Sequence, residues 1–373
     1  MEKVLITGGA GFIGSHTADL LINNGYKVCI LDNFEAQVHG NKKPNYLNSE
    51  AELFIGDATK KEDLLNALKN VDAVIHLAAV TGIGQSMYKP FHYLNTNTVG
   101  TSNLYQILID NPDIRKNLKK IVIASSKTIY GEGSYSCKVH GTVYPEPRSV
   151  EQLKIKDWEV HCPICNDYVK PVGTTEEKPP QILSVYALSK YDTEEMALMY
   201  SKIFEIPTII FRWFSVYGPR QSLNNPYTGV CSIFINRVKN KNQPIIFEDG
   251  KQLRDYIFVE DIARLNLQVI KDKINTNIYN VGTGSPVSVL DVAETVIDIL
   301  DIPTEPSITE NFRAGDNRHD FADISKVKKD LKFKPKHDFK DGIKKLIEWS
   351  ESEKPVDNFE TAESERKKYL GGK

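Results

Sequence analysis

The first half of the chain alternates short apolar runs with segments of helical periodicity. The apolar runs show little alternation between apolar and polar positions, which is typical of strands buried on both faces of a sheet. The predicted strands are residues 3–7, 27–31, 52–56, 73–76, 120–125 and 207–212. The predicted helices are residues 12–24, 61–68, 95–109 and 185–204. Strands that alternate with helices in this way predict an α/β fold with a doubly wound parallel sheet.

The pattern becomes less regular after about residue 215, where Pro and Gly are frequent. The later predicted helices are residues 260–271, 289–300 and 324–331. We therefore expect one domain over residues 1–212 and a smaller, partly interleaved C-terminal lobe over residues 213–350. The highly charged residues 351–373 predict a frayed or disordered tail.

One long segment, residues 132–180, carries many Pro, Gly and charged residues and shows no clean periodicity. An irregular segment of that length inside a compact domain is usually functional or held by an added constraint. The chain has 5 cysteines, which are too few for a disulfide scaffold. Cys29 and Cys231 stand alone in apolar stretches and are predicted to be small core residues. The other cysteines lie in the irregular segment.

The irregular segment contains two pairs of metal-binding residue types, Cys137-x-x-His140 and Cys162-x-x-Cys165. Three thiolates and one imidazole form a closed tetrahedral set that suits structural zinc, and they leave no open position for catalysis. A metal would supply the constraint that a segment with few apolar residues lacks. His161 is an alternative ligand, and reduced cysteines in a surface loop are the alternative interpretation.

Composition and charge narrow the range of partners. The chain has 373 residues, of which 40% are hydrophobic and 26% are charged, and its formal net charge is -2. A near-neutral chain lacks the basic surface that binding to nucleic acid or to an acidic membrane usually needs. No apolar run approaches the roughly 20 residues that span a bilayer. The amino terminus runs directly into a predicted strand, with no cleavable signal before it, so we expect a cytoplasmic protein.

The turn between the first predicted strand and the first predicted helix reads TGGAGFIG over residues 7–14. Gly8, Gly11 and Gly14 allow a tight turn, close approach of the backbone to a pyrophosphate, and close packing of helix on strand. The phosphates would then meet the free N–H groups at the start of the helix. Asp32 ends the second strand, where a carboxylate accepts hydrogen bonds from a ribose 2′-hydroxyl and repels a 2′-phosphate. This pattern favours NAD over NADP.

Two later strand ends add candidates for the same site. The Asp57 carboxylate could meet the adenine amino group, and capping of the next helix is the alternative role. The small residues after His76 would let the backbone approach the cofactor, whereas His76 itself is expected to have a core role. The predicted cofactor-binding residues are Gly8, Gly11, Phe12, Ile13, Gly14, Asp32, Asn33, Asp57, Ala58, Leu77, Ala78, Ala79, Tyr186 and Lys190.

Tyr186 and Lys190 are four positions apart in a predicted helix and therefore share one face. A lysine ammonium beside a phenol and a nicotinamide ribose favours the phenolate, which lowers the pKa of the phenol. Such a base can take a proton from a sugar hydroxyl near neutral pH. Ser126, at the end of a predicted strand, would add a hydrogen bond to the same oxygen. We predict that Ser126, Tyr186 and Lys190 are the catalytic residues.

Together these motifs resemble the extended short-chain dehydrogenase/reductase family of nucleotide-sugar epimerases and dehydratases. The resemblance covers roughly residues 1–345 apart from the irregular segment. It rests on TGGAGFIG at residues 7–14, SSKTIYG at 125–131, YALSK at 186–190, RWFSVYGPR at 212–220, RDY at 254–256 and RAGDNR at 313–318. It implies a Rossmann-type fold with a substrate-binding lobe, tightly bound NAD, a nucleotide-diphosphate sugar as the substrate, and a homodimer through the helices at 95–109 and 185–204.

One position in the family separates the reactions. Members that act as 4,6-dehydratases carry an Asp-Glu pair where this chain has Lys127 and Thr128. The resemblance therefore favours a 4-epimerase over a 4,6-dehydratase. In a 4-epimerase, Tyr186 would take the proton of the 4-hydroxyl while a hydride passes to NAD. The 4-keto sugar would then turn over and receive the hydride on its other face.

A finer resemblance to dTDP-L-rhamnose 4-epimerase-like proteins comes from TGIGQSMY at residues 81–88 and from the irregular segment. In the family, the arginines that match Arg254 and Arg318 hold the nucleotide diphosphate through their guanidinium groups, and a surface salt bridge is the alternative role. Ser215 stands where many 4-epimerases have an Asn that contacts the diphosphate. The predicted substrate-binding residues are Thr81, Ser86, Thr128, Ser215, Arg254 and Arg318.

We therefore expect a 4-epimerase that acts on a dTDP- or UDP-hexose. A net 4-ketoreductase of the same fold, which would release its dinucleotide in each cycle, is the nearest alternative. A decarboxylase of the same family would also want an acidic residue near Thr128. A non-catalytic NAD-sensing scaffold is the alternative from a different class, but it has no need for Ser126, Tyr186 and Lys190 together.

Overall fold

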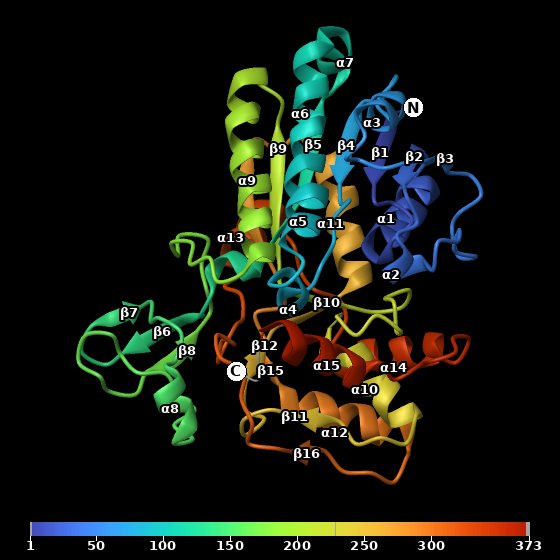
Figure 1. The fold of residues 1–373 in the computed structure, drawn as a ribbon. Helices are drawn as coiled ribbons and strands as arrows, with labels where there is room; N and C mark the ends of the chain where they lie inside the picture. The colour runs from blue at the N-terminus through green and yellow to red at the C-terminus, as the bar shows by residue number, and fades with distance from the viewer. Residues whose placement is uncertain (1, 228, 371–373) are drawn as a thin grey trace.

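The computed structural model describes residues 2–227 and 229–370. Its centre is a 7-stranded parallel sheet with the strand order β14-β9-β5-β4-β1-β2-β3 (Figure 1). The strands are β1 (Lys3–Thr7), β2 (Lys27–Asp32), β3 (Glu52–Ile55), β4 (Ala73–His76), β5 (Lys120–Ser126), β9 (Thr208–Trp213) and β14 (Asn277–Val281). The predicted doubly wound parallel sheet is confirmed, and β14 is an edge strand that the apolar pattern did not predict.

Helices cover both faces of this sheet. On one face, α1 (Phe12–Asn23) packs against α11 (Val259–Lys271), and the other face carries α3 (Lys61–Ala67), α6 (Gly100–Asp110) and α9 (Val185–Phe204). Successive residues of each strand point to opposite faces, so neighbouring apolar residues fill two separate cores. This double burial explains why the strands read as continuous apolar runs.

Shorter helical segments complete this part of the chain. The predicted helix at 95–109 is the end of a longer helical stretch, which begins at residue 90 and contains π-helical turns. The segments are α2 (Ala36–His39), α4 (Ile83–Ser86), α5 (Pro90–Tyr93), a π-helical stretch (Leu94–Val99), α7 (Pro112–Asn117) and a 3-10 turn (Lys127–Tyr130). Among the described residues, no helix is both long enough and apolar enough to cross a membrane.

A second lobe lies at the carboxyl ends of the central strands and has its own apolar core (Figure 1). Its strands pair as β10 (Ser215–Tyr217) with β13 (Tyr256–Phe258), β11 (Ile245–Ile246) with β16 (Ser307–Ile308), and β12 (Leu253–Arg254) with β15 (Val287–Ser288). Its helices are α10 (Val230–Lys239), α12 (Val289–Leu300) and α14 (Phe339–Ser350). The chain returns to the central sheet at α11, at β14 and at α13 (Ser325–Leu331), so the two parts are interleaved.

Residues 132–180 form an arm that extends beside the main body (Figure 1). The arm contains α8 (Val150–Lys154) and an antiparallel sheet of β6 (Ser134–Cys137), β7 (Gly141–Val143) and β8 (Lys170–Val172). Its small apolar core consists of Tyr135, Cys137, Val143, Val160, Cys162 and Val169. Two of these core residues are themselves cysteines of the predicted metal site.

The prediction of a frayed tail over residues 351–373 is wrong for residues 359–370, which form the helix α15 (Phe359–Leu370), and residues 371–373 lie outside the described part of the chain. Side-chain contacts with the main body hold it: the Arg237 guanidinium lies 4.6 Å from the centre of the Phe359 ring, and Tyr369 stacks on Tyr88. A helix of this length gains most of its stability from such tertiary contacts, which composition does not reveal.

Candidate functional site

The glycine turn after β1 is packed too closely for side chains. Gly8 has a φ of +67°, and a Cβ there would lie 2.8 Å from the backbone nitrogen of Ala78. A Cβ on Gly14 would lie 2.5 Å from the carbonyl oxygen of Gly8. Gly11 is the N-cap residue of α1, and no side chain caps the helix there. The first N–H groups of α1 are therefore suited to phosphate oxygens.

Asp32 is fixed beside this turn at the carboxyl end of β2. Its carboxylate accepts hydrogen bonds from the backbone N–H groups of Ala10, at 3.0 Å, and Phe34, at 2.9 Å. These bonds orient a buried acidic group next to the glycine turn, where a ribose hydroxyl would lie. Backbone close to the phosphates and a carboxylate close to the ribose together fit a dinucleotide such as NAD.

Asn33 and Asp57 come together at the ends of β2 and β3. The Asn33 side-chain amide donates to Asp57 Oδ2 at 3.1 Å, and the Thr59 N–H donates to Asp57 Oδ1 at 2.8 Å. Burial raises the pKa of Asp57, but the hydrogen bonds from Thr59 and Asn33 outweigh it and hold the pKa below its ordinary value. The structure thus shows a carboxylate that organises the turn before α3, and Ala58 beside it is buried.

The residues after β4 approach the same turn. The N–H groups of Leu77 and Ala78 each donate to Thr7 Oγ1 at 3.2 Å. His76 is buried between the hydroxyls of Thr7, at 2.8 Å, and Thr101, at 3.1 Å. Burial lowers the pKa of His76 to about 3, with a smaller contribution from Lys190. His76 is therefore a neutral core residue, as the sequence predicted.

The three predicted catalytic residues meet at the carboxyl end of β5. Ser126 ends this strand, Tyr186 and Lys190 lie on the first turns of α9, and the Tyr186 hydroxyl lies close enough to Ser126 for this residue to act on its pKa. Lys190 Nζ donates to the carbonyl oxygen of Ala124 at 2.9 Å. The Ser184 hydroxyl caps α9 by accepting the N–H of Ala187, which fixes the start of the helix.

Burial controls the protonation of this group. It raises the pKa of Tyr186 to about 12, although Ser126 acts in the opposite direction, and it lowers the pKa of Lys190 to about 8. Both shifts favour the uncharged side chain. The sequence predicted a lowered pKa for the Tyr186 phenol. Ser126 and Lys190 by themselves do not produce it, because burial of Tyr186 has the larger effect.

Lys127 and Thr128, the two residues after Ser126, make different contacts. Thr128 Oγ1 donates to Ser126 Oγ at 3.0 Å, so this predicted substrate residue directly supports the serine. Lys127 is ion-paired with Asp320 of the second lobe, and its side chain is largely buried. The position where dehydratases carry an acid is thus occupied by a lysine that links the two lobes.

The loop with the predicted substrate residues Thr81 and Ser86 lies between the lobes. The carbonyl oxygen of Thr81 accepts the Tyr93 hydroxyl at 2.9 Å, and the buried Ser86 hydroxyl donates to Ile83 O at 2.6 Å. Tyr88, at the end of this loop, forms a hydrogen bond with Glu365 of α15 at 3.0 Å. The C-terminal helix therefore lies against the loop.

In the second lobe, Arg254 and Ser215 are brought close in the fold. Ser215 on β10 pairs with Tyr256 on β13, two residues after Arg254. The half-buried Arg254 guanidinium donates to three carbonyl oxygens at 2.8 Å, those of Leu253, Asn317 and Arg318. These bonds hold the guanidinium in one orientation and leave part of it exposed.

The structure does not support the predicted contact between Arg318 and the substrate. The Arg318 side chain is 0% exposed, and its guanidinium is ion-paired with Glu159, Glu248 and Asp249. Arg313, five residues earlier in the same RAGDNR run, is a candidate that we missed. Its half-buried guanidinium lies 4.2 Å from the centre of the Phe247 ring and pairs with Glu363 of α15. The RAGDNR motif, which contains both arginines, was the available signal for this candidate.

Cys137, His140, Cys162 and Cys165 converge in the arm, and their ligand atoms all lie within 4.8 Å of one another. Cys137 Sγ lies 3.5 Å from His140 Nδ1 and 3.8 Å from Cys165 Sγ, and Cys162 Sγ lies 3.6 Å from His140 Nδ1. A tetrahedral zinc ion with Zn–S near 2.3 Å and Zn–N near 2.1 Å places two sulfurs about 3.8 Å apart and a sulfur and a nitrogen about 3.6 Å apart. The separations of these three atom pairs therefore match a tetrahedral zinc ion, and the other pairs lie within 4.8 Å.

His161, the alternative ligand, is engaged elsewhere. Its Nδ1 lies 2.9 Å from the carbonyl oxygen of Asn166, and its Nε2 lies 2.8 Å from Asp157 Oδ2. The structure therefore favours His140 as the nitrogen ligand.

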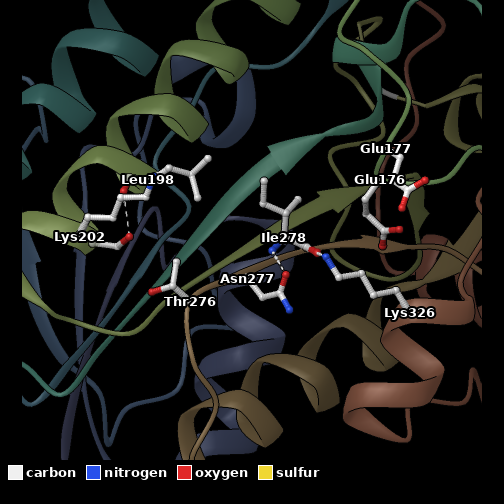
Figure 2. Close-up of a pocket in the computed structure, with 9 residues that line it drawn as sticks. Glu176, Glu177, Leu198, Lys202, Thr276, Asn277, Ile278 and Lys326 are labelled. Carbon is white, nitrogen blue, oxygen red and sulfur yellow. Dashed lines mark hydrogen bonds between the residues drawn. The ribbon is translucent and has the colours of Figure 1, made fainter.

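A separate groove lies along the edge strand β14, and Figure 2 shows its lining. It is formed by residues of α9, the start of β14 and the end of the arm, including Lys202, Asn277 and Glu176. None of the predicted catalytic, cofactor-binding or substrate-binding residues lines it. We therefore assign the reaction to the carboxyl ends of the strands, where ligands bind in sheets of this kind.

Comparisons with known proteins identify the family to which this chain belongs. Residues 4–150 and 167–282 match the NAD dependent epimerase/dehydratase family. The dTDP-L-rhamnose 4-epimerase of Burkholderia thailandensis is 32% identical over 353 residues, which cover 93% of this chain and 94% of the relative.

Solved structures of two enzymes are also similar. The UDP-glucose 4-epimerase of Thermotoga maritima with UDP-glucose has a TM-score of 0.76 and 29% identity, with 94% of this chain and 98% of the other covered. The UDP-glucuronic acid 4-epimerase of Bacillus cereus, in complex with UDP-glucuronic acid and NAD, has a TM-score of 0.76 and 26% identity, with 94% and 99% covered. The chain belongs to the NAD-dependent epimerase/dehydratase family of nucleotide-sugar enzymes.

Proposed function

We propose that this protein is an NAD-dependent nucleotide-sugar 4-epimerase that acts on a dTDP- or UDP-hexose. The observation that carries the proposal is the meeting of Ser126, Tyr186 and Lys190 at the sheet end that also holds the glycine turn and Asp32. The similarity to enzymes that epimerise carbon 4 of dTDP- and UDP-linked sugars supports the same reaction.

The catalytic group would act on the sugar 4-hydroxyl. Tyr186, in its phenolate form, accepts the hydroxyl proton as the hydride leaves carbon 4, and it returns a proton when the hydride comes back to the opposite face. Ser126 holds the sugar oxygen through a hydrogen bond, and Lys190 offers positive charge to the phenolate. When bound, NAD accepts and returns the hydride. The 4-keto sugar must turn over between the two transfers.

The residues around this group favour epimerisation over dehydration. Loss of water would need a carboxyl pair at positions 127 and 128. Lys127 is ion-paired with Asp320 instead, and Thr128 is hydrogen-bonded to Ser126. The chain therefore lacks the acid and the base at the place where carbons 5 and 6 would lose hydrogen and hydroxide.

Bound cofactor separates an epimerase from a net 4-ketoreductase. An epimerase regenerates NAD in each cycle and has no need to release it, so we expect nearly one NAD per purified chain. The measurement is quantification of the NAD released by acid denaturation. Cofactor-free protein that requires added NADH for turnover would favour the reductase.

Asp32→Asn is expected to weaken the retention of NAD about 10- to 100-fold, because the variant loses a charged hydrogen bond to the ribose. The check is the dissociation constant for NAD, determined calorimetrically on stripped protein. Asp113→Asn, at an exposed carboxylate of α7, is the matched control and should bind NAD normally. Equal affinities in the wild type and Asp32→Asn would remove Asp32 from the cofactor site.

We also propose that Cys137, His140, Cys162 and Cys165 bind one structural zinc ion. The match between their separations and tetrahedral zinc geometry supports this. Four protein ligands leave no coordination position for substrate, so the metal would order the arm. Because reduced thiols persist mainly in the cytoplasm, the zinc site also supports a cytoplasmic location.

A homodimer through α6 and α9 is a further part of the proposal. The two helices lie side by side (Figure 1) and carry exposed apolar residues: Ile203 is 67% exposed and Met199 is 56% exposed on adjacent turns of α9. In a symmetric dimer, the same face of a second protomer would cover these apolar side chains.

Combined Met199→Glu and Ile203→Glu substitutions are therefore expected to give a monomer of 42.1 kDa. Each protomer of a dimer would bring two carboxylates into the interface, and their burial without partners would cost more free energy than the interface supplies. The measurement is light scattering coupled to size-exclusion chromatography. Ile155→Glu, at an apolar residue of the arm that is 77% exposed, should leave the dimer intact. A wild type that is already monomeric would contradict this part.

A further inference from the structure

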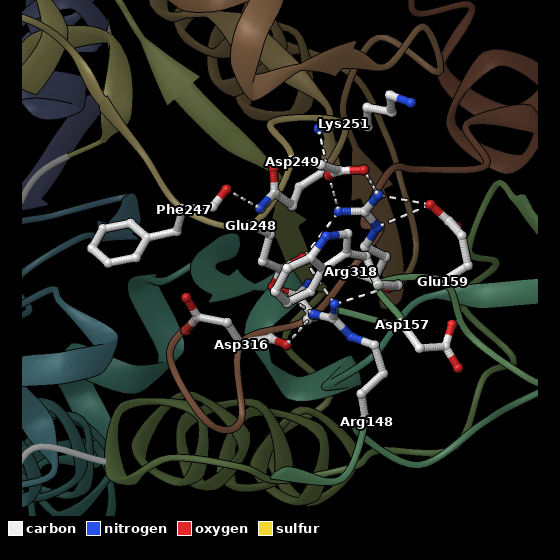
Figure 3. Close-up of polar contacts among 12 residues, drawn as sticks. Arg148, Asp157, Glu159, Phe247, Glu248, Asp249, Lys251, Asp316 and Arg318 are labelled. Atoms are coloured by element: carbon white, nitrogen blue, oxygen red, sulfur yellow. Dashed lines mark hydrogen bonds and ion pairs between the residues drawn. The ribbon is translucent and has the colours of Figure 1, made fainter. Parts of the chain in front are cut away.

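The arm is joined to the second lobe by ion pairs around buried arginines, which Figure 3 shows. At the centre is Arg318. Its guanidinium contacts Glu159 of the arm at 2.7 Å, and Glu248 at 2.9 Å and Asp249 at 2.7 Å from the second lobe. A fully buried guanidinium is costly unless it is paired, so these carboxylates determine where Arg318 can lie.

A second buried arginine, Arg148, comes from the arm itself. It donates to both carboxylate oxygens of Glu248, at 2.8 and 2.9 Å, and to the carbonyl oxygens of Trp158, at 2.9 Å, and Asp316, at 3.0 Å. Glu248 thus bridges Arg148 and Arg318. Arg148 therefore contacts both Trp158, which precedes Glu159 in the arm, and Asp316, which precedes Asn317 in the loop.

The arm also holds the backbone of the loop that contains Arg318. The buried Glu132 carboxylate accepts the N–H of Arg318 at 2.8 Å, the N–H of His319 at 3.2 Å and the hydroxyl of Tyr135 at 2.7 Å. Glu159 adds a contact with His319 Nε2 at 3.1 Å. The bond from Tyr135 to Glu132 lies within the arm, and the other three link the arm to Arg318 and His319.

This loop in turn positions Arg254. The two terminal nitrogens of the Arg254 guanidinium donate hydrogen bonds to the carbonyl oxygens of Asn317 and Arg318, each at 2.8 Å. A shift of the loop would therefore rotate the guanidinium fork away from its present direction. A fork that binds phosphate oxygens in pairs is sensitive to such a rotation.

We propose that Glu159 is a positioning residue for the nucleotide diphosphate: it holds Arg318, and through the loop at residues 317–318 it orients Arg254. The inference rests on the proposed function and on the contact between Arg254 and the nucleotide diphosphate that the family resemblance implies. Hydrogen bonding to His319, together with the charge of Arg318, lowers the pKa of Glu159 to about 2, so its carboxylate is charged at any working pH.

The arrangement also gives the metal cluster a role beyond the arm. Glu159 precedes the ligand Cys162 by three residues, and Tyr135 precedes the ligand Cys137 by two. The two segments that contact the loop therefore both end at the cluster. A bound metal would fix the far ends of these segments, and the contacts of Glu132 and Glu159 with residues 318–319 would transmit that order to Arg254.

The first test is Glu159→Gln in the full-length holoenzyme. The variant keeps the length of the side chain but loses its charge, so we expect about a tenfold rise in KM for the nucleotide sugar and in Kd for dTDP or UDP alone. The kcat, the NAD content and the zinc content should stay near wild type. Asp157→Asn is the matched control, because Asp157 contacts His161 and Tyr168 within the arm, and it should leave both constants unchanged.

A double-mutant cycle with Arg254→Gln separates positioning from general destabilisation. If Glu159 acts through Arg254, Glu159→Gln should weaken dTDP or UDP binding less than twofold in the Arg254→Gln background. The inference would be overturned if Glu159→Gln still weakened binding tenfold in the Arg254→Gln background. It would also be overturned if Glu159→Gln alone left Kd unchanged, or if that variant lowered kcat without changing KM.

The two proposals fail in different ways. A wild type that binds dTDP or UDP but inverts no sugar would refute the epimerase assignment, while the Kd cycle still decides the role of Glu159. A wild type that binds neither nucleotide would overturn the positioning role. Should Glu159→Gln not fold, His319→Gln removes one partner of Glu159 more gently, and the same KM-against-kcat split applies to it.

Discussion

Tyr186→Phe is expected to reduce carbon-4 epimerisation by about 10²- to 10⁴-fold, because the variant lacks the hydroxyl that exchanges a proton with the sugar. The loss should appear in kcat, since the ring and its packing remain. NAD content should be retained, because the glycine turn and Asp32 are unaffected. The measurement combines the rate of inversion with quantification of bound NAD in the same preparation.

Tyr200→Phe is the matched control for this variant. Tyr200 lies on the same helix, α9, but its ring stacks on Tyr105 at a centroid distance of 4.7 Å, away from Ser126. It should epimerise at the wild-type rate. If Tyr186→Phe were as active as Tyr200→Phe, another group would have to transfer the proton, and the assignment of Tyr186 would fail.

Removal of the metal is expected to unfold the arm. Structural zinc contributes about 10–16 kcal/mol of apparent binding free energy in small zinc domains, and the arm has only a six-residue apolar core to replace it. Cys162→Ser should therefore lose zinc and become at least about tenfold more sensitive to trypsin between residues 132 and 180, which requires a loss of only about 1.4 kcal/mol. The measurements are metal content by mass spectrometry and mapping of the cleavage sites.

His161→Gln provides the comparison for metal loss. His161 lies next to Cys162 but contacts Asp157 and Asn166 instead of the cluster, so this variant should keep its zinc. Wild-type protein that contains no zinc after purification without chelator would contradict the zinc assignment. Loss of zinc in both variants would instead indicate that the arm does not tolerate substitution near the cluster.

The parts of the molecule that sequence predicted best are those whose cause is local. The glycine turn requires glycine because Ala78 and the backbone of Gly8 leave no room for a Cβ, and that requirement is visible in the residue types themselves. Tyr186 and Lys190 share a helix face by their spacing alone. Ser126 ends a strand whose apolar pattern marks its boundary. These features needed no knowledge of distant contacts.

The parts that sequence did not predict depend on distant contacts. Arg318 and Arg313 are similar residues in one short motif, and only the carboxylates Glu159, Glu248 and Asp249 distinguish them. The first of these carboxylates comes from the arm, about 160 positions earlier in the chain. The helix α15 has no apolar stripe and is held by contacts with Arg237, Tyr88 and other side chains of the main body.

The edge strand β14 was not predicted either, because its polar residues find their partners in distant segments of the chain. Its five residues contain two asparagines, which the pattern of a buried strand does not include. In the structure, Asn280 is buried, and its side chain accepts the Tyr130 hydroxyl at 2.7 Å and donates to Thr174 O at 2.8 Å. Polar partners from other segments thus make a polar strand residue acceptable.

The central claim is that the chain inverts carbon 4 of a nucleotide-linked hexose with the cofactor it already holds. The most direct test incubates the purified protein, without added NAD, with dTDP-, UDP- and GDP-hexoses and follows the configuration of carbon 4 by NMR. We predict inversion of a dTDP- or UDP-hexose to an equilibrium mixture of the two 4-epimers. No inversion of any sugar, together with consumption of NADH when a 4-keto sugar nucleotide is supplied, would contradict the account and identify a reductase.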